Sequence, residues 1–203
     1  MEAHFAPCGG CQLNYKHVTY HTYTKMEEKT DIDRIRTVSQ SGCGLCCVCM
    51  AVELLTPMML SIEDCVKIAE ACGASHRVGT DMKILGPVIA EKYNLKYSYT
   101  SDLDEAIKSL QCGAHIIAHV GVPEGKKIGL FTKSGHYISL ISTDGKEFCI
   151  LDPSLSENKF EIPERVGKVN TKNAPYLYCD VNVVDGECAP GKIKYHVFQR
   201  KKV

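Results

Sequence analysis

Uncharged, largely apolar residues run without interruption from position 45 to position 52, and Glu53 is the first charged side chain after them. A helix made of such residues is apolar nearly all round, which is typical of a helix buried inside a domain. Cys43 stands just before this run, between two glycines. The pattern therefore predicts a buried helix that begins close to Cys43.

The period of an amphipathic helix recurs over residues 62–71, 79–93 and 102–110. Ser61 is suited to cap the first of these helices, and Pro87 lies inside the second without interrupting its apolar pattern. An alternating strand is predicted over residues 95–99 and a fully buried one over residues 114–120. The chain thus begins with helices and becomes richer in strands later.

Residues 134–153 are predicted to form a β-hairpin, because β-branched and aromatic runs flank Asp144 and Gly145. A three-residue loop that ends with Gly145 in the left-handed conformation makes a bulge, and counting outward then places His136 opposite Asp152. A two-residue loop turns His136 to the other face of the sheet. Only the first register brings an imidazole and a carboxylate within hydrogen-bonding reach.

Cys43 has the position of a catalytic nucleophile. The unpaired N–H groups and the positive dipole at a helix start lower the pKa of a thiol and can also hold an oxyanion. The flanking glycines are expected to leave room for a substrate backbone. Together with His136 as base and Asp152 as orienting group, Cys43 completes a nucleophile, base and orienter set. The cysteines inside the apolar run are interpreted as small core residues.

Charge and composition narrow the function classes. The 203 residues carry 24 basic and 24 acidic side chains, and the only basic run is the short pair at 201–202, so no nucleic acid partner is expected. No apolar stretch reaches membrane-spanning length, and the start lacks the pattern of a signal peptide. We expect one domain over residues 1–203, a monomer without membrane contact and a cytoplasmic location, or a secreted one if a signal was removed.

Twelve cysteines raise the questions of disulfides and of metal. Adjacent cysteines within an apolar helix suit reduced thiols in a cytoplasm better than a disulfide framework. Cys8 and Cys11 have the spacing of half a zinc knuckle, but no second pair follows at a finger-like distance. His115 and His119 share a face of their strand and lack a third ligand, which favours a structural role. We therefore expect neither a metal nor a cofactor.

Residues 43–52 resemble the Cys-Gly-x-Ala-x-Leu-Ala-Met signature of the double-glycine-leader peptidases of bacteriocin exporters and their stand-alone relatives, a bacterial family. Gly135-His136-Tyr137 and Leu151-Asp152-Pro153 resemble that family's strand histidine and Asp-Pro. Residues 110–118 resemble its passage from helix to strand. The resemblance covers about residues 39–154.

The resemblance implies a papain-like α+β fold, in which a helical lobe bearing the cysteine on its central helix packs on an antiparallel sheet bearing His136 and Asp152. It implies a cysteine peptidase or amide hydrolase that acts on a peptide or protein substrate through a thioester. Residues 1–38 are then a lead-in of unknown role, residues 39–170 the catalytic core and residues 171–203 a strand-rich tail.

The chain departs from the family at the oxyanion hole. Exporter-linked members carry a glutamine donor six residues before the cysteine, and Thr37 stands there in this chain. Either Gln40, the nearest glutamine, takes this role from a different backbone path, or the oxyanion hole relies on the Cys43 backbone N–H and another donor that the sequence does not identify. A second register compares residues 40–47 with the papain pattern Gln-Gly-Ser-Cys-Gly-Ser-Cys-Trp and makes Cys46 the nucleophile. We prefer Cys43, because the apolar pattern after it fits the first family better.

Two other function classes stay open from the sequence. A papain-like pseudoenzyme or peptide-binding domain would keep the shell and recognise a peptide without cleaving it. A zinc-dependent protein would use the surplus of cysteines as ligands.

Overall fold

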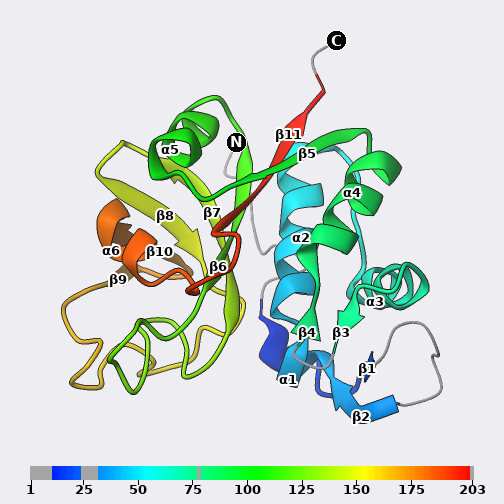
Figure 1. Cartoon of the computed structure of the whole chain (residues 1–203), viewed down its shortest axis with the longest axis horizontal. Helices are drawn as coiled ribbons and strands as arrows, with labels where there is room; N and C mark the ends of the chain where they lie inside the picture. The colour runs from blue at the N-terminus through cyan, green and yellow to red at the C-terminus, as the bar shows by residue number, and fades with distance from the viewer. Residues whose placement is uncertain (1–10, 24–31, 77–78, 202–203) are drawn as a thin grey trace.

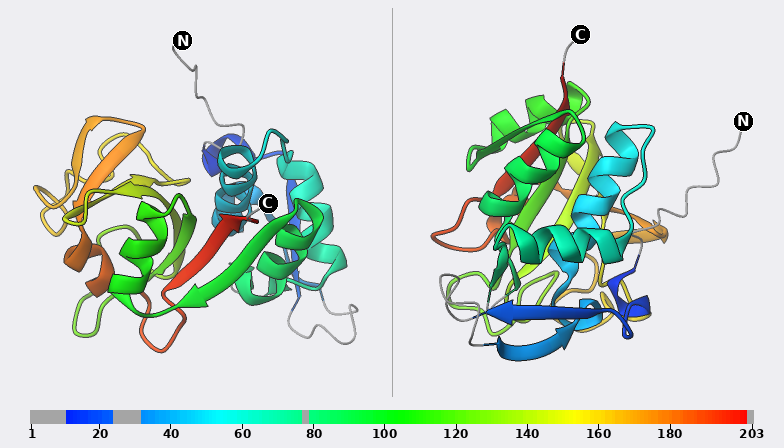
Figure 2. Two further views of the ribbon diagram at one scale, coloured as in Figure 1. Left: turned by 90° about the horizontal axis from the view of Figure 1, so that it is seen from above. Right: turned by 90° about the vertical axis from the view of Figure 1, so that its right-hand side faces the viewer.

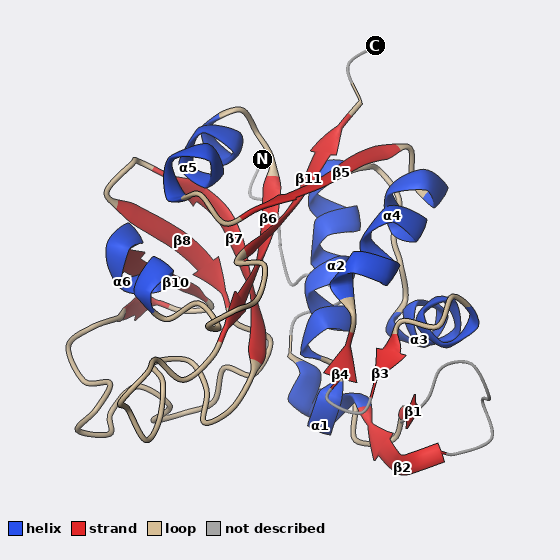
Figure 3. Cartoon of the chain, viewed as in Figure 1, coloured by secondary structure: helices blue, strands red, loops and turns tan. Residues whose placement is uncertain are grey.

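A computed structural model of the chain describes residues 11–23, 32–76 and 79–201. It is a mixed α and β structure, with most of its helices on one side and a large sheet on the other (Figures 1 and 3). The helices are η1 (Gln12–Asn14), α1 (Val38–Ser41), α2 (Cys43–Leu55), α3 (Ile62–Ala71), α4 (Met82–Lys92), α5 (Leu103–Gln111) and α6 (Val181–Gly186). No helix in the described part of the chain is long and apolar enough to cross a bilayer.

Two sheets organise the strands. The smaller has the order β2-β1-β3-β4, with strands β1 (Thr19–Tyr23), β2 (Ile32–Thr37), β3 (Ser75–His76) and β4 (Gly79–Thr80). The larger is antiparallel, with the order β5-β11-β6-β7-β8-β10-β9. Its strands are β5 (Leu95–Thr100), β6 (His115–Val120), β7 (His136–Thr143), β8 (Glu147–Leu151), β9 (Asn170–Asn173), β10 (Tyr176–Asp180) and β11 (Tyr195–Arg200).

Helix α2 is the buried helix that the apolar run predicts. It begins at Cys43, and its buried side chains include Leu45, Cys46, Cys47 and Val48, all without exposed surface. The core around α2 also contains side chains of α3 and α4 and, from the large sheet, Ile117 of β6. The first turn of α2 is thereby fixed against the sheet while its body forms the core.

The strand β11, near the C-terminus, lies inside the large sheet. It pairs with both β5 and β6, so that Tyr195 is opposite Thr100 on one side and Ala118 on the other (Figure 2). The opposite face of this sheet holds a second core cluster, which includes residues of α5 and α6. The segment expected to be a tail therefore supplies an interior strand of the sheet, next to the edge strand β5.

Most of the predicted elements agree with the structure. Helix α3 has the predicted bounds, and Ser61 caps it by accepting a hydrogen bond from the Asp64 N–H (3.1 Å). Helix α4 contains Pro87 as expected but begins at Met82, because the preceding Gly79–Thr80 pair forms strand β4. The strands predicted over residues 95–99 and 114–120 are β5 and β6.

The hairpin of β7 and β8 is present, but both predicted registers are wrong. Thr143 pairs with Phe148, which leaves a four-residue loop, and a bulge after Leu140 shifts the pairing by one residue. The Asp144 carboxylate sets this loop by accepting hydrogen bonds from two N–H groups that follow it (both 2.8 Å). Gly145 has φ +90°, the left-handed conformation that was predicted.

The expected lead-in contributes structure of its own. Tyr20 of β1 is fully buried, and its hydroxyl lies 2.9 Å from the Thr80 hydroxyl. Cys8 lies outside the described residues, and Cys11, which has the spacing of half a zinc knuckle with it, is a free thiol. The N-terminal hairpin thus supports the strand that leads into α4.

Replacing Leu45 by alanine should lower the free energy of unfolding by about 2–5 kcal/mol, because it opens a cavity in a fully buried helix. Urea unfolding measures the change. The matched control is Met59→Ala at a side chain that is 67% exposed, which should stay within about 0.5 kcal/mol of the wild type. Equal losses in the two variants would contradict the placement of α2 in the core.

Candidate active site

Cys43 is the first residue of α2, and its side chain is partly exposed. The backbone N–H groups of Tyr137 and Gly44 contribute to lowering the pKa of its thiol. The remaining N–H groups of the first turn have no helical carbonyl to bond, as at any helix start. A helix start of this kind stabilises a thiolate and offers donors to a neighbouring anion.

The glycines around Cys43 have a packing role that differs from the expected one. A Cβ on Gly42 would lie 2.4 Å from a Val38 methyl carbon, and a Cβ on Gly44 would lie 3.0 Å from Thr80 and 3.1 Å from the Tyr137 ring. The space beside both glycines is therefore filled by the protein itself. They allow α1, β4 and β7 to approach the helix start, rather than leaving room for a substrate backbone.

His136, the first residue of β7, forms a buried pair with Asp152. Its Nε2 lies 2.8 Å from Asp152 Oδ1, and the two side chains are 6% and 0% exposed. Asp152 follows the last residue of β8 and reaches the imidazole although the observed register does not place the two opposite each other. The same imidazole also acts on the Cys43 thiol, through its charge and through a hydrogen bond.

The three groups shift one another's pKa values. Burial alone would raise the pKa of Cys43, but the charge of His136 and a hydrogen bond from it hold that pKa below its ordinary value. Burial opposes the charged form of His136, yet Asp152 and then Cys43 raise its pKa to about 9. Burial likewise opposes the Asp152 carboxylate, and His136 nevertheless holds its pKa well below its usual range. The charges therefore favour a thiolate beside an imidazolium.

Cys46 does not have the environment of a nucleophile. It is fully buried one turn inside α2, and burial raises its pKa well above the ordinary value. Cys47 behaves in the same way. The imidazole approaches Cys43 instead, as the first of the two proposed registers requires.

Gln40 serves the helix that precedes the site. It is exposed, and its Oε1 accepts a hydrogen bond from the Thr37 N–H (3.1 Å) in the capping box of α1. No hydrogen bond of its side chain to Cys43 or His136 is found among the described residues. Its assignment to an oxyanion hole stays a prediction without geometric support.

Gln12, which was not among the predicted site residues, bonds to a residue next to Asp152 and to a residue of the helix that precedes Cys43. Its backbone N–H donates to the Pro153 carbonyl (2.8 Å), and its Nε2 donates to the Ser39 carbonyl (3.0 Å). Its side chain is buried, and its Oε1 has no hydrogen-bond partner among the described residues. The signal was hidden because the β1–β2 hairpin separates Gln12 from the cysteine motif along the chain.

Ser154 and Lys159 were also missed, and both contact the carboxylate. The Ser154 N–H and hydroxyl lie 2.9 and 3.1 Å from Asp152 Oδ1. Lys159 donates to Asp152 Oδ2 at 2.5 Å, with only 7% of its side chain exposed. No pattern in the sequence marks them, since both belong to a polar segment after the strand.

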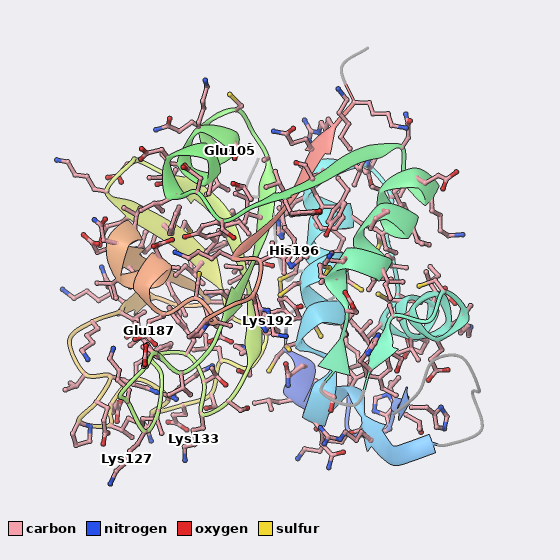
Figure 4. All side chains as sticks on the ribbon, viewed as in Figure 1. Glu105, Lys127, Lys133, Glu187, Lys192 and His196 are labelled. Atoms are coloured by element: carbon pink, nitrogen blue, oxygen red, sulfur yellow. The ribbon has the colours of Figure 1, made fainter. Side chains whose placement is uncertain are left out.

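A cavity of about 270 Å³ has lining residues from both the helical half and the sheet half, and among them is Tyr137, which follows His136 in β7. It is lined by His76, Thr80, Asp81, Met82, Lys83, His119, Tyr137, Lys192, Ile193 and His196. Lys192 and His196 lie between the two halves in Figure 4. Burial lowers the pKa of His119 and of His196 to about 4, so both rings are neutral near pH 7. The cavity thus offers hydrogen-bonding rings beside the helix start.

The histidines of β6 have structural environments. His115 is buried and lies 3.0 Å from the Ser139 hydroxyl, and burial lowers its pKa to about 3. His119 stacks near the Tyr137 ring with centroids 4.5 Å apart. Across residues 11–23, 32–76 and 79–201, no three His, Cys, Asp or Glu side chains are grouped so that they could hold a metal ion.

Comparison with protein-family profiles and with curated protein sequences finds no match for this chain.

Iodoacetamide at about pH 6 should label Cys43 before any other cysteine, because an ordinary thiol is less than about 1% ionised there. Peptide mapping after one equivalent of reagent identifies the labelled site. His136→Ala should slow the labelling of Cys43, since it removes the imidazolium that stabilises the thiolate. Label found mainly on Cys46 would assign the nucleophile to the other register, and even labelling would contradict both.

Proposed function

We propose that the protein is a cysteine peptidase or amide hydrolase with a papain-like fold. The observation that carries the proposal is the buried His136–Asp152 pair, whose imidazole faces the thiol at the start of α2. The packing of a helical half against an antiparallel sheet, with the thiol on one and the imidazole on the other, supports the fold assignment. The grouping of nucleophile, base and orienting group supports acyl transfer as the reaction.

In the first half of the reaction, the Cys43 thiolate attacks the carbonyl carbon of a peptide or amide. A sulfur–carbon bond forms, and the carbonyl oxygen becomes an oxyanion. The carbon–nitrogen bond then breaks as the His136 imidazolium gives its proton to the leaving amine. The thioester remains on Cys43, and Asp152 keeps the imidazole in the orientation that this proton transfer needs.

In the second half, neutral His136 takes a proton from water while the water oxygen attacks the thioester carbon. The second oxyanion collapses, the sulfur–carbon bond breaks, and the acid product leaves. The thiolate and the imidazolium are restored, so that one water is consumed for each bond cleaved. No cofactor takes part in this scheme.

We assign the oxyanion to the helix start and to Gln12. The N–H groups at the start of α2 lie beside the sulfur, where the oxyanion develops. The Nε2 of Gln12 has a second hydrogen besides the one given to Ser39, and its segment bonds to Pro153 next to the orienting carboxylate. The cavity between the halves is the site that we propose for a side chain of the peptide substrate.

A peptide and amide substrate library incubated with the purified protein tests the proposal. Hydrolysis should occur with the wild type and be lost in Cys43→Ala, which removes the nucleophile but not a core side chain. Unchanged turnover in that variant would overturn the proposal. A peptide that binds both proteins without being cleaved by either would favour the peptide-binding class instead.

The two glutamines make a matched pair for the oxyanion hole. Gln12→Ala should lower kcat by about 10²–10³ with little change in KM, because an oxyanion donor acts in the transition state. Gln40→Ala should retain kcat and lose about 1 kcal/mol of stability, because it removes part of a helix cap. Steady-state kinetics and urea unfolding measure both effects. The reverse pattern would return the oxyanion hole to Gln40.

A further inference from the structure

Lys159 lies in the interior with its ammonium group turned to the orienting carboxylate. Its Nζ is 2.5 Å from Asp152 Oδ2, 2.7 Å from Ser154 Oγ and 3.4 Å from the Ser154 carbonyl. An ammonium group has three N–H donors, and each finds an acceptor here. Ser154 Oγ in turn lies 3.0 Å from His136 Nε2. The lysine therefore contacts Asp152 directly and is linked to His136 through Ser154.

The two oxygens of Asp152 have divided roles. Oδ1 accepts from His136 Nε2 and from the Ser154 N–H, while Oδ2 accepts from Lys159. A fully buried carboxylate is costly unless its charge is compensated. Lys159 supplies a second compensating charge, which Asp152 stabilises although burial lowers the pKa of the ammonium group. His136 supplies a compensating charge only while it is protonated.

We propose that Lys159 is a positioning residue that neutralises the charge of Asp152. The Cys43 thiolate and the His136 imidazolium then form beside an Asp152–Lys159 pair whose net charge is zero. The inference rests on the proposed function for its catalytic meaning. Thiolate, imidazolium, carboxylate and ammonium then alternate in sign. Without the ammonium, the same site would have a net negative charge whenever the thiol ionised.

Charged or titratable groups of neighbouring segments also act on these four groups. The Arg165 guanidinium bonds to the Lys159 carbonyl (3.2 Å) and to Gly129 (3.1 Å), and its charge acts on both Asp152 and Lys159. Burial lowers the pKa of Arg165, and the negative charge of the buried Glu187 acts against this lowering. The charge of His136 also acts on His119, whose pKa burial lowers to about 4, so that its ring is neutral near pH 7. Among these groups in the described chain, Lys159 is the one that bonds to the orienting carboxylate.

The pH dependence of Cys43 alkylation separates a charge effect from a structural one. Removing a positive charge raises the pKa of every neighbouring group. Lys159→Met should therefore move the onset of iodoacetamide labelling upward by roughly one pH unit, which is about tenfold in rate near the onset. The upper limb, where His136 loses its proton, should move upward as well. Lys159→Arg retains the charge and should keep both limbs near their wild-type positions.

A charge-compensating pair completes the test. Asp152→Asn leaves Lys159 as an unpaired cation and should move both limbs downward, whereas Asp152→Asn combined with Lys159→Met removes both charges and should return them toward the wild type. Lys67→Met, which removes an exposed ion pair with Asp64, is the control and should move neither limb. Circular dichroism and urea unfolding establish that each variant is folded.

A folded Lys159→Met protein with unchanged limbs would overturn the inference. If that variant does not fold, the comparison is between Asp152→Asn and the double variant, and equal limbs in those two would overturn it. The alkylation profile requires no substrate. If no peptide is cleaved, the proposed function fails while the profile still tests Lys159. If peptides are cleaved and the limbs do not move, the hydrolase stands without this role for the lysine.

Discussion

A buried carboxylate is the constraint on which the site depends. Asp152 has no exposed side-chain surface, and an ionised carboxylate leaves water only when charges and donors replace its hydration. Here His136, Ser154 and Lys159 supply those partners. The loop after β8 must fold back to bring them together. The same contacts that make the burial tolerable also fix the imidazole against the thiol.

Helix α2 has two roles: its body fills the core, and its first turn forms part of the candidate site. Its body is apolar on every side because it fills the core between α3, α4 and the sheet, and its first turn provides the N–H groups that stabilise an anion. Close packing at that turn excludes side chains from both glycines around Cys43. Because the start of α2 packs closely against β7, the Cys43 sulfur and the His136 imidazole are kept near each other.

Local pattern was enough to predict much of this fold. The bounds of α3 follow from its hydrophobic period and its cap, and the beginning of α2 follows from the apolar run after Cys43; both signals act over a few turns. The register of β7 and β8 does not follow, because the Asp144 side chain stabilises a four-residue loop and a bulge then shifts the ladder. His136 and Asp152 are hydrogen-bonded, but not because they are directly opposite each other in the hairpin, as the prediction had it. The carboxylate extends past the end of its strand to reach the ring.

The residues that sequence reasoning missed share a physical cause. Gln12 reaches the site across an intervening hairpin, and Lys159 reaches it through a loop without periodic pattern, so neither is marked by its sequence neighbours. Their positions depend on tertiary contacts with Pro153 and Asp152, which are adjacent in sequence. Asp152 and Pro153 thus connect the parts of the site. The Asp152 carboxylate bonds to the imidazole and to the ammonium group, and the Pro153 carbonyl accepts a hydrogen bond from the segment of Gln12. A change that displaces this step would therefore disturb the base, its charge balance and the glutamine segment together, although these come from three distant parts of the chain.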